Sequence, residues 1–162
     1  MTSEEGAALA VVAVGGNLPG RFASVRESLE AAIGALPDAG LEVVRRSGFL
    51  RTEAWPDPAE LEYLNAALIV RTRLSPREVL AALHAVEARF GRVRSAPNAP
   101  RTVDLDLIAY EQMTFEEPGL TLPHPRARER RFVLEPLVEI APTWRFADGA
   151  TAAELLARLP EP

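Results

Sequence analysis

The chain has 162 residues, of which 25% are charged, and a formal net charge of −5; these values are ordinary for one soluble globular domain. No apolar run approaches the roughly 20 residues that cross a bilayer, and the acidic start lacks the basic region of a secretory signal. The acidic balance disfavours nucleic-acid binding. We therefore expect one domain over residues 1–162, with residues 1–8 flexible, and with neither membrane nor nucleic-acid partners. We also expect a cytoplasmic protein that is a monomer.

Two residue types are missing from the chain, and their absence excludes several chemistries. The 18 basic residues are all arginine, and there is no cysteine. Without lysine there can be no Walker A loop, no kinase-type strand lysine and no Schiff base. Without cysteine there is no disulfide framework and no thiolate nucleophile. Any phosphate chemistry must therefore use arginine, histidine, backbone amides and metal.

Hydrophobic periodicity predicts the main elements. Continuous or alternating apolar runs indicate strands, and apolar residues at helical spacing indicate helices. Ser75 and Glu78 form a capping-box pattern at the start of one helix. The expected elements are a strand at 9–14 that ends in Gly15-Gly16-Asn17, a helix at 21–36, an extended segment at 41–51, a strand at 63–73, a helix at 75–90 and a strand at 103–110.

The last third of the chain is expected to add smaller elements. We predict a hairpin from the strand at 103–110 to residues 114–115, an irregular segment at 118–125, a helix at 130–140 and a short final helix. The final helix begins at a second capping box, from Thr151 to Glu154. The β-α-β-β-α-β order of the main elements predicts an α+β fold, a ferredoxin-like βαββαβ sandwich with additional C-terminal helices and a hairpin.

Two aspartates, Asp104 and Asp106, occupy alternate positions of the strand predicted at 103–110. Side chains at i and i+2 of a strand share one face, so the two carboxylates repel each other unless a cation lies between them. Mg²⁺ is commonly held by one or two carboxylates together with substrate phosphates. Arginine side chains suit phosphate oxygens. Three of them precede the strand: Arg92, Arg94 and Arg101. The pattern indicates Mg²⁺-nucleotide chemistry.

Several short motifs occur together in one order. A first strand that ends in Gly-x-Asn is followed by Tyr-Leu-Asn-Ala-Ala (63–67), Gly-Arg-Val-Arg (91–94), Pro-Arg-Thr-Val-Asp-Leu-Asp (100–106), Leu-Pro-His-Pro (122–125) and Pro-Leu-Val-Glu-Ile-Ala-Pro (136–142). Each motif alone is weak, but the ordered set is specific. From about residue 9 to residue 149, the chain resembles the 6-hydroxymethyl-7,8-dihydropterin pyrophosphokinases of folate biosynthesis.

The resemblance implies that ATP gives pyrophosphate to 6-hydroxymethyl-7,8-dihydropterin and leaves as AMP. It also implies that Asp104 and Asp106 bind two Mg²⁺ ions. The implied catalytic residues are Arg92, Arg101, Asp104 and Asp106. The implied ATP-binding residues are Glu87, Arg92, Arg94, Arg101, His124 and Arg130. The implied pterin-binding residues are Thr52, Tyr63, Asn65, Phe132 and Asp104, with Phe132 stacked on the pterin ring and Asn65 hydrogen-bonded to its edge.

The chain departs from the family pattern around this site. Gly16 stands where serine is usual. The segment Glu53–Pro56 replaces a Pro-Pro-x-Gly stretch of the family. Trp55 in this segment is a candidate to cover the bound pterin with an apolar side chain. Arg92, Arg94 and Arg101 are expected to lie in one loop, called here the arginine loop. Asn98 lies in the part of this loop where the family has a tryptophan, and Pro125 replaces a tyrosine. We expect these changes to affect rate and loop closure rather than the type of reaction.

Other interpretations stay open from the residues alone. Asp104 and Asp106 can be the solvated face of an ordinary strand, and Tyr63 and Phe132 can be core aromatic residues. A non-catalytic ferredoxin-like module that binds a nucleotide or serves regulation would need neither a metal pair nor a closing arginine loop. A two-metal phosphodiesterase would be expected to have more carboxylate or histidine ligands than two aspartates and His124.

Overall fold

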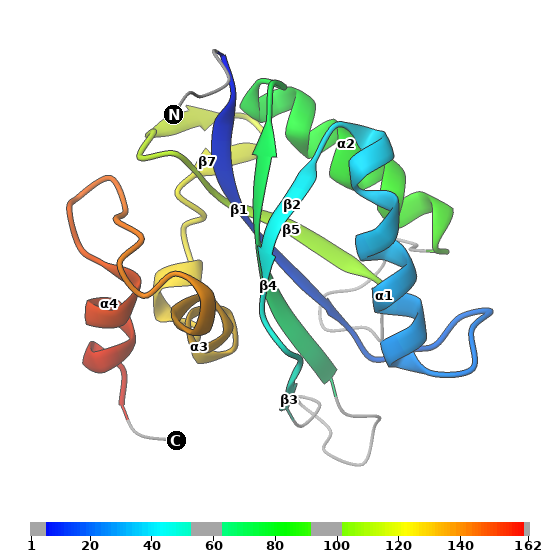
Figure 1. Cartoon of the computed structure of the whole chain (residues 1–162). Helices are drawn as coiled ribbons and strands as arrows, with labels where there is room; N and C mark the ends of the chain where they lie inside the picture. The colour runs from blue at the N-terminus through cyan, green and yellow to red at the C-terminus, as the bar shows by residue number, and fades with distance from the viewer. Residues whose placement is uncertain (1–5, 53–62, 92–101, 161–162) are drawn as a thin grey trace.

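The computed structural model describes residues 6–52, 63–91 and 102–160 (Figure 1). Within these ranges the strands are β1 (Ala8–Gly16), β2 (Glu42–Arg46), β3 (Leu50–Thr52), β4 (Tyr63–Thr72), β5 (Asp104–Tyr110), β6 (Phe115–Glu117) and β7 (Leu120–Leu122). The helices are α1 (Val25–Ala35), α2 (Pro76–Arg89), α3 (Arg131–Ile140) and α4 (Ala152–Arg158), with short 3-10 turns η1 (Pro37–Ala39) and η2 (Ala127–Glu129). None of these helices is both long and apolar enough to cross a membrane.

One antiparallel sheet organises the fold. Its strand order is β2-β4-β1-β5, and β3 also pairs with β4. Helices α1 and α2 cover one face of the sheet, and α3 and α4 cover the other (Figure 1). This is the order of a βαββαβ sandwich in which β2 and β3 together form the second strand. The predicted fold class is therefore confirmed, and α3 and α4 are the additional C-terminal helices.

Two hydrophobic cores lie on the two faces of the sheet, and strand alternation assigns residues to them. Val12 packs toward α1 and α2, whereas its neighbour Val11 packs toward α3 and α4. In β5, Leu105 belongs to the α1–α2 side. Asp104 and Asp106, on either side of Leu105, therefore project toward the α3 side, where both are partly exposed.

Two predicted elements have different limits in the structure. The helix predicted at 21–36 begins only at Val25, because the Ser24 side chain caps its N-terminus. The extended segment after it is split into β2 and β3 at the buried Ser47. The backbone N–H of Ser47 donates to the Ala67 carbonyl oxygen at 3.0 Å, and its hydroxyl accepts the Ala67 N–H at 2.9 Å. This exchange of hydrogen bonds with β4 satisfies the backbone where the strand is interrupted.

The hairpin lies at a different place from the one predicted. β5 does not pair with residues 114–115; instead β6 pairs with β7, so part of the segment predicted to be irregular is a strand. Pro118 and Gly119 connect the two strands, and Gly119 has a positive φ of 85°. Proline followed by a glycine with positive φ is the pattern of a tight turn. This Pro-Gly pair is the signal that the sequence prediction overlooked.

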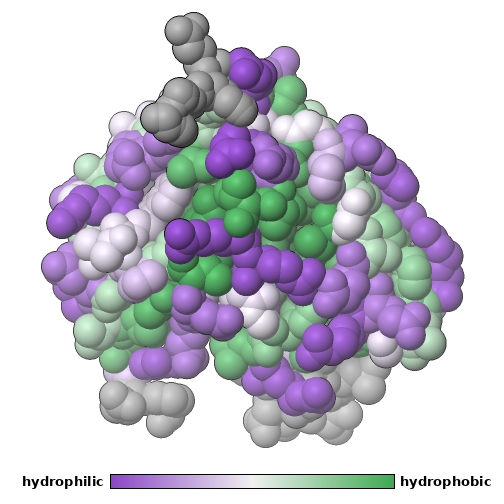
Figure 2. Space-filling view, in the orientation of Figure 1, coloured by the Kyte–Doolittle hydropathy of each residue, from purple (hydrophilic) through white to green (hydrophobic). Residues whose placement is uncertain are grey.

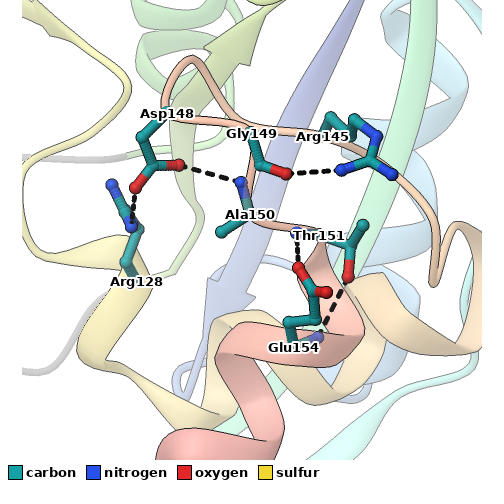
Figure 3. A network of polar contacts seen from close by, with 7 residues as sticks. All are labelled: Arg128, Arg145, Asp148, Gly149, Ala150, Thr151 and Glu154. Atoms are coloured by element: carbon teal, nitrogen blue, oxygen red, sulfur yellow. Dashed lines mark hydrogen bonds and ion pairs between the residues drawn. The ribbon is translucent and has the colours of Figure 1, made fainter.

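An ion pair joins the loop between α3 and α4 to η2. The carboxylate of Asp148 forms an ion pair with Arg128 and accepts the backbone N–H of Ala150 at 3.1 Å (Figure 3). α4 then begins at the predicted capping box, in which Thr151 and Glu154 exchange side-chain and backbone hydrogen bonds. The ion pair therefore holds η2 against the loop that leads into α4.

β2 is an edge strand of the sheet. Its residues Glu42, Arg45 and Arg46 are exposed, while Val43 and Val44 each pack against a different core. In the orientation of Figure 1, hydrophobic residues gather in the middle of the view, with hydrophilic residues around and across them (Figure 2). Charged residues on an edge strand discourage pairing with another chain, so β2 is a poor edge for association.

Candidate active site

Three strands place two predicted binding sites in one row across the sheet. Gly15 of β1 pairs in register with Asn65 of β4 on one side and with Asp104 of β5 on the other. In the next row on the same face, Asp106 pairs with Ala13. Neighbouring strands lie about 4.8 Å apart, so the Cα atoms of Asn65 and Asp104 are about 10 Å apart. The residues predicted to bind pterin and metal therefore share one face, with only a glycine between them.

Gly15 leaves room between these two side chains. A Cβ atom at this position would lie 2.9 Å from the Oδ1 atom of Asn65, which is closer than packed side chains tolerate. Gly16 is enclosed as tightly, because a Cβ atom there would overlap the carbonyl oxygen of Thr102. Glycine in place of the family's usual serine thus matches the close approach of Thr102. The sequence prediction did not assign a role to Gly15, although a glycine inside a strand is itself a signal of close backbone approach.

The side chain of Asn65 is held by β3. Asn65 is 8% exposed, and its Nδ2 atom donates to the Thr52 hydroxyl at 3.1 Å. This bond directs the Oδ1 atom toward Gly15. Thr52 pairs with Tyr63 across the two strands, and Tyr63 is half-buried. These three of the five residues predicted to bind the pterin are therefore neighbours at one end of the sheet.

His124 is fastened to the outer edge of β5. Its backbone N–H donates to the Ile108 carbonyl oxygen at 2.8 Å, and its Nδ1 atom accepts the backbone N–H of Arg126 at 3.2 Å. Burial lowers the pKa of His124, as do the nearby Arg130 and Arg126, whereas Asp104 acts in the opposite direction. The ring is therefore neutral at pH 7, and the bond to Nδ1 assigns its proton to Nε2.

Arg130 and Phe132 lie at the start of α3, which packs against β4 (Figure 1). Arg130 is the N-cap residue of this helix, and its guanidinium carbon lies 5.6 Å from the centroid of the Phe132 ring. Phe132 is 40% exposed, so it is not a core aromatic residue. An accessible ring and a guanidinium group thus stand next to each other at this end of the helix.

Glu87 lies on the other side of β5 from the aspartates. Its side chain is 1% exposed, and its Oε2 atom accepts the backbone N–H of Leu105 at 2.7 Å. The contact connects α2 to the residue that separates Asp104 from Asp106. The predicted contact of Glu87 with ATP stays a prediction.

The arginine loop lies outside the described residues, so the predicted phosphate contacts of Arg92, Arg94 and Arg101 stay predictions. Trp55 and Asn98 lie outside them as well. Within residues 6–52, 63–91 and 102–160, no group of three or more His, Cys, Asp and Glu side chains is placed to hold a metal ion. A pair of carboxylates fits Mg²⁺, which completes its shell with waters and substrate phosphates. It does not fit the richer ligand set of a two-metal phosphodiesterase.

The fold and the site together define a class of protein. A ferredoxin-like sheet carries an aspartate pair, a neutral histidine and an arginine at one end, and such groups bind and orient phosphates. The class is that of transferases that handle phosphate groups. Residues 11–142 match the family model described as 7,8-dihydro-6-hydroxymethylpterin-pyrophosphokinase (HPPK), and the chain belongs to this family.

Curated relatives agree with the family model. The 2-amino-4-hydroxy-6-hydroxymethyldihydropteridine pyrophosphokinase of Synechocystis sp. is 45% identical over 136 residues, which are 83% of this chain and 67% of the relative. The protein of the same name from Methylorubrum extorquens is 39% identical over 150 residues, 93% of this chain and 92% of the relative. The chain is therefore an ATP-dependent diphosphotransferase of folate biosynthesis, and the predicted enzyme class is confirmed.

Solved structures show the same fold. Plasmodium falciparum HPPK-DHPS, wild type with pteroate, superposes with a TM-score of 0.69 at 12% identity. The match covers 98% of this chain and 43% of the solved chain, so this chain spans less than half the length of that protein. The same Plasmodium falciparum protein with pterin and p-hydroxybenzoate gives a TM-score of 0.67. At this identity the likeness supports the fold alone.

Proposed function

We propose that this chain transfers pyrophosphate from ATP to the hydroxymethyl group of 6-hydroxymethyl-7,8-dihydropterin, releases AMP, and uses Asp104 and Asp106 to bind two Mg²⁺ ions with the nucleotide. The observation that carries the proposal is the row Asn65–Gly15–Asp104 across the sheet. A pterin held by Asn65 would extend its hydroxymethyl group over Gly15 toward phosphates held at Asp104. Such positioning supplies much of the rate in phosphoryl-type transfer.

The residues around Asp104 suit a polyphosphate. The like charges of Asp104 and Asp106 favour uptake of a cation, and Mg²⁺ bound there would neutralise phosphate charge and lower the pKa of the attacking hydroxyl. Arg130 offers a forked donor to phosphate oxygens. His124 adds the Nε2–H donor of its neutral ring. Arg92, Arg94 and Arg101 are proposed to close over the phosphates, and Arg92 and Arg101 to act in catalysis.

The residues around Asn65 suit a pterin. The amide of Asn65 offers a donor and an acceptor, which match the alternating donors and acceptors of a pterin edge. The accessible Phe132 provides an apolar face on which a flat ring can stack. Thr52 and Tyr63 lie next to Asn65 and are proposed to contact the same pterin ring. This arrangement separates recognition of the acceptor from binding of the phosphates, as a two-substrate transfer requires.

Calorimetry of ATP binding with and without Mg²⁺ tests the metal assignment. We expect the affinity for ATP to fall at least about tenfold without Mg²⁺, because two carboxylates left unneutralised repel the phosphates by about 1.4 kcal/mol or more. Binding that is tight and independent of Mg²⁺ would contradict the proposal and favour a nucleotide-binding regulatory module. The variant D106N serves as a control, since its affinity should depend less on Mg²⁺.

Two substitutions of His124 separate its two ring nitrogens. Asparagine can accept the Arg126 N–H in place of Nδ1 but does not reach the position of Nε2, so H124N should weaken Mg²⁺-ATP binding about 10- to 100-fold, the loss of a hydrogen bond to a charged group. Glutamine places an amide N–H near Nε2, so H124Q should bind more tightly than H124N. Calorimetry measures both dissociation constants. Equal values for the two variants would contradict donation from Nε2.

Replacing Gly15 with alanine should raise the KM for the pterin about tenfold, because the added methyl group displaces the Asn65 amide at an overpacking cost of about 1–3 kcal/mol. The matched control is G34A in α1, where an added Cβ meets no atom within 4 Å. We expect G34A to keep the KM and to stabilise the fold by about 0.5–1 kcal/mol. Steady-state kinetics and thermal unfolding measure both effects. An unchanged KM in G15A would show that Asn65 does not need the space.

The cellular location and the oligomeric state are part of the same proposal. We propose a cytoplasmic monomer without nucleic-acid or membrane partners. The exposed charges on the edge strand β2 support the monomer.

A further inference from the structure

β5, the strand that carries the aspartate pair, is the last strand in the order of the sheet. Among the residues that the structure describes, the strand order β2-β4-β1-β5 gives β5 one strand partner, β1. Leu105 pairs in register with Val14, between the rows that contain Asp104 and Asp106. The outward backbone groups of such a strand need partners from elsewhere in the chain. How the outer edge of β5 is held therefore decides how firmly the two aspartates are placed.

Glu87 holds this edge at Leu105. Its Oε2 atom lies 2.7 Å from the Leu105 nitrogen, a short distance typical of a hydrogen bond to a charged acceptor. Glu87 is 1% exposed, and its buried neighbours on α2 include the apolar residues Val79, Leu83 and Val86. A carboxylate in such surroundings costs folding energy unless it is well bonded. Retention of a carboxyl group at this buried position calls for a role other than filling space.

We propose that Glu87 is a positioning residue: it fixes the backbone of Leu105 and thereby sets the direction of the Asp104 and Asp106 carboxylates before substrates bind. The inference rests on the proposed function of that aspartate pair. Asp104 and Asp106 leave the strand on the face opposite to Leu105, so a shift or twist of this one residue moves both carboxylates. Groups that orient metal ligands from behind are typically worth about 10- to 100-fold in metal affinity or activity.

Three variants separate positioning from stability. E87M keeps the length of the side chain but removes the oxygen acceptor, whereas E87Q keeps an oxygen that can accept the Leu105 N–H. V86A is the matched control, because Val86 is buried next to Glu87 in α2 and its truncation lowers stability while leaving the Glu87 acceptor of the Leu105 N–H in place. If E87M does not fold, E87Q takes its place in the comparison with V86A.

The first measurement is hydrogen exchange of the Leu105 amide in the metal-free protein. We expect faster exchange in E87M than in V86A at equal global stability, with E87Q in between. The second is binding of Mn²⁺ in the presence of a non-hydrolysable ATP analogue, followed by electron paramagnetic resonance. We expect about 10- to 100-fold weaker binding in E87M, a smaller loss in E87Q, and no change in V86A at temperatures where each variant is folded.

The outcomes are distinct. If E87M, or E87Q where E87M does not fold, matches V86A in both measurements, the positioning role is overturned. If D106A binds Mn²⁺ and the nucleotide as tightly as the unaltered protein, the proposed metal site fails instead. Exchange at Leu105 then still decides whether Glu87 fixes the strand: faster exchange in the Glu87 variants supports that role, and unchanged exchange overturns it.

Discussion

Replacing Asp106 with alanine is expected to lower kcat/KM by about a thousandfold or more. Loss of a cation ligand removes several kcal/mol of charge stabilisation in the transition state, and about 4 kcal/mol corresponds to a thousandfold. Asp106 and Asp104 occupy alternate positions on β5 and project on the same face, so D104A should behave similarly. D106N preserves the shape of the side chain and tests the charge alone. Steady-state kinetics at saturating Mg²⁺ measures the effect.

Thermal unfolding distinguishes this loss from a folding defect. Both aspartates are partly exposed, so removal of one carboxylate should change the Tm only slightly. D38N is a suitable control, because Asp38 is an exposed residue of η1, remote in sequence from β5, and should leave both kcat/KM and Tm unaltered. D106N with near-normal activity would contradict the assignment of Asp106 to the metal.

The second large effect is expected at Asn65. Replacing it with leucine keeps a similar volume but removes the donor and the acceptor that are proposed to bind the pterin edge. Each hydrogen bond left unmade in a buried site costs about 1–3 kcal/mol, so two of them should weaken pterin binding about 30-fold to more than 1000-fold. The affinity for Mg²⁺-ATP should stay close to its original value, because Asn65 lies two strands away from Asp104.

T52V is the matched control for Asn65. Valine has nearly the shape of threonine and removes only the hydroxyl that accepts from Asn65 Nδ2. We expect a loss of up to about tenfold in pterin affinity, the value of one hydrogen bond that orients the amide. Fluorescence titration with the pterin compares the variants. Pterin affinity that is equal in N65L and in the unaltered protein would exclude Asn65 from the pterin site.

Local patterns predicted much of the fold. The apolar runs of β1 and β4, the capping boxes at Ser75 and Thr151, and the order of strands and helices are found where they were expected. Alternation along β5 also predicted that the two aspartates share a face. These features depend on residues close together in the sequence, and their physical rules act over a few residues.

Contacts between distant segments could not be predicted in the same way. The register of three strands decides that Gly15 lies between Asn65 and Asp104, and no single strand contains that information. Likewise, nothing near Glu87 in the sequence reveals that its carboxylate meets the Leu105 amide. The predicted hairpin was misplaced because the sequence prediction put the turn directly after β5. In the structure the turn lies at Pro118 and Gly119, between β6 and β7.

The most direct test of the account is to identify the products when the protein is mixed with ATP, Mg²⁺ and 6-hydroxymethyl-7,8-dihydropterin. Phosphorus NMR distinguishes AMP from ADP and a diphosphate ester from a monophosphate. We expect AMP and the pterin diphosphate in equal amounts, formed only when the pterin is present. ADP with a monophosphorylated pterin, or no nucleotide product from folded protein, would contradict it.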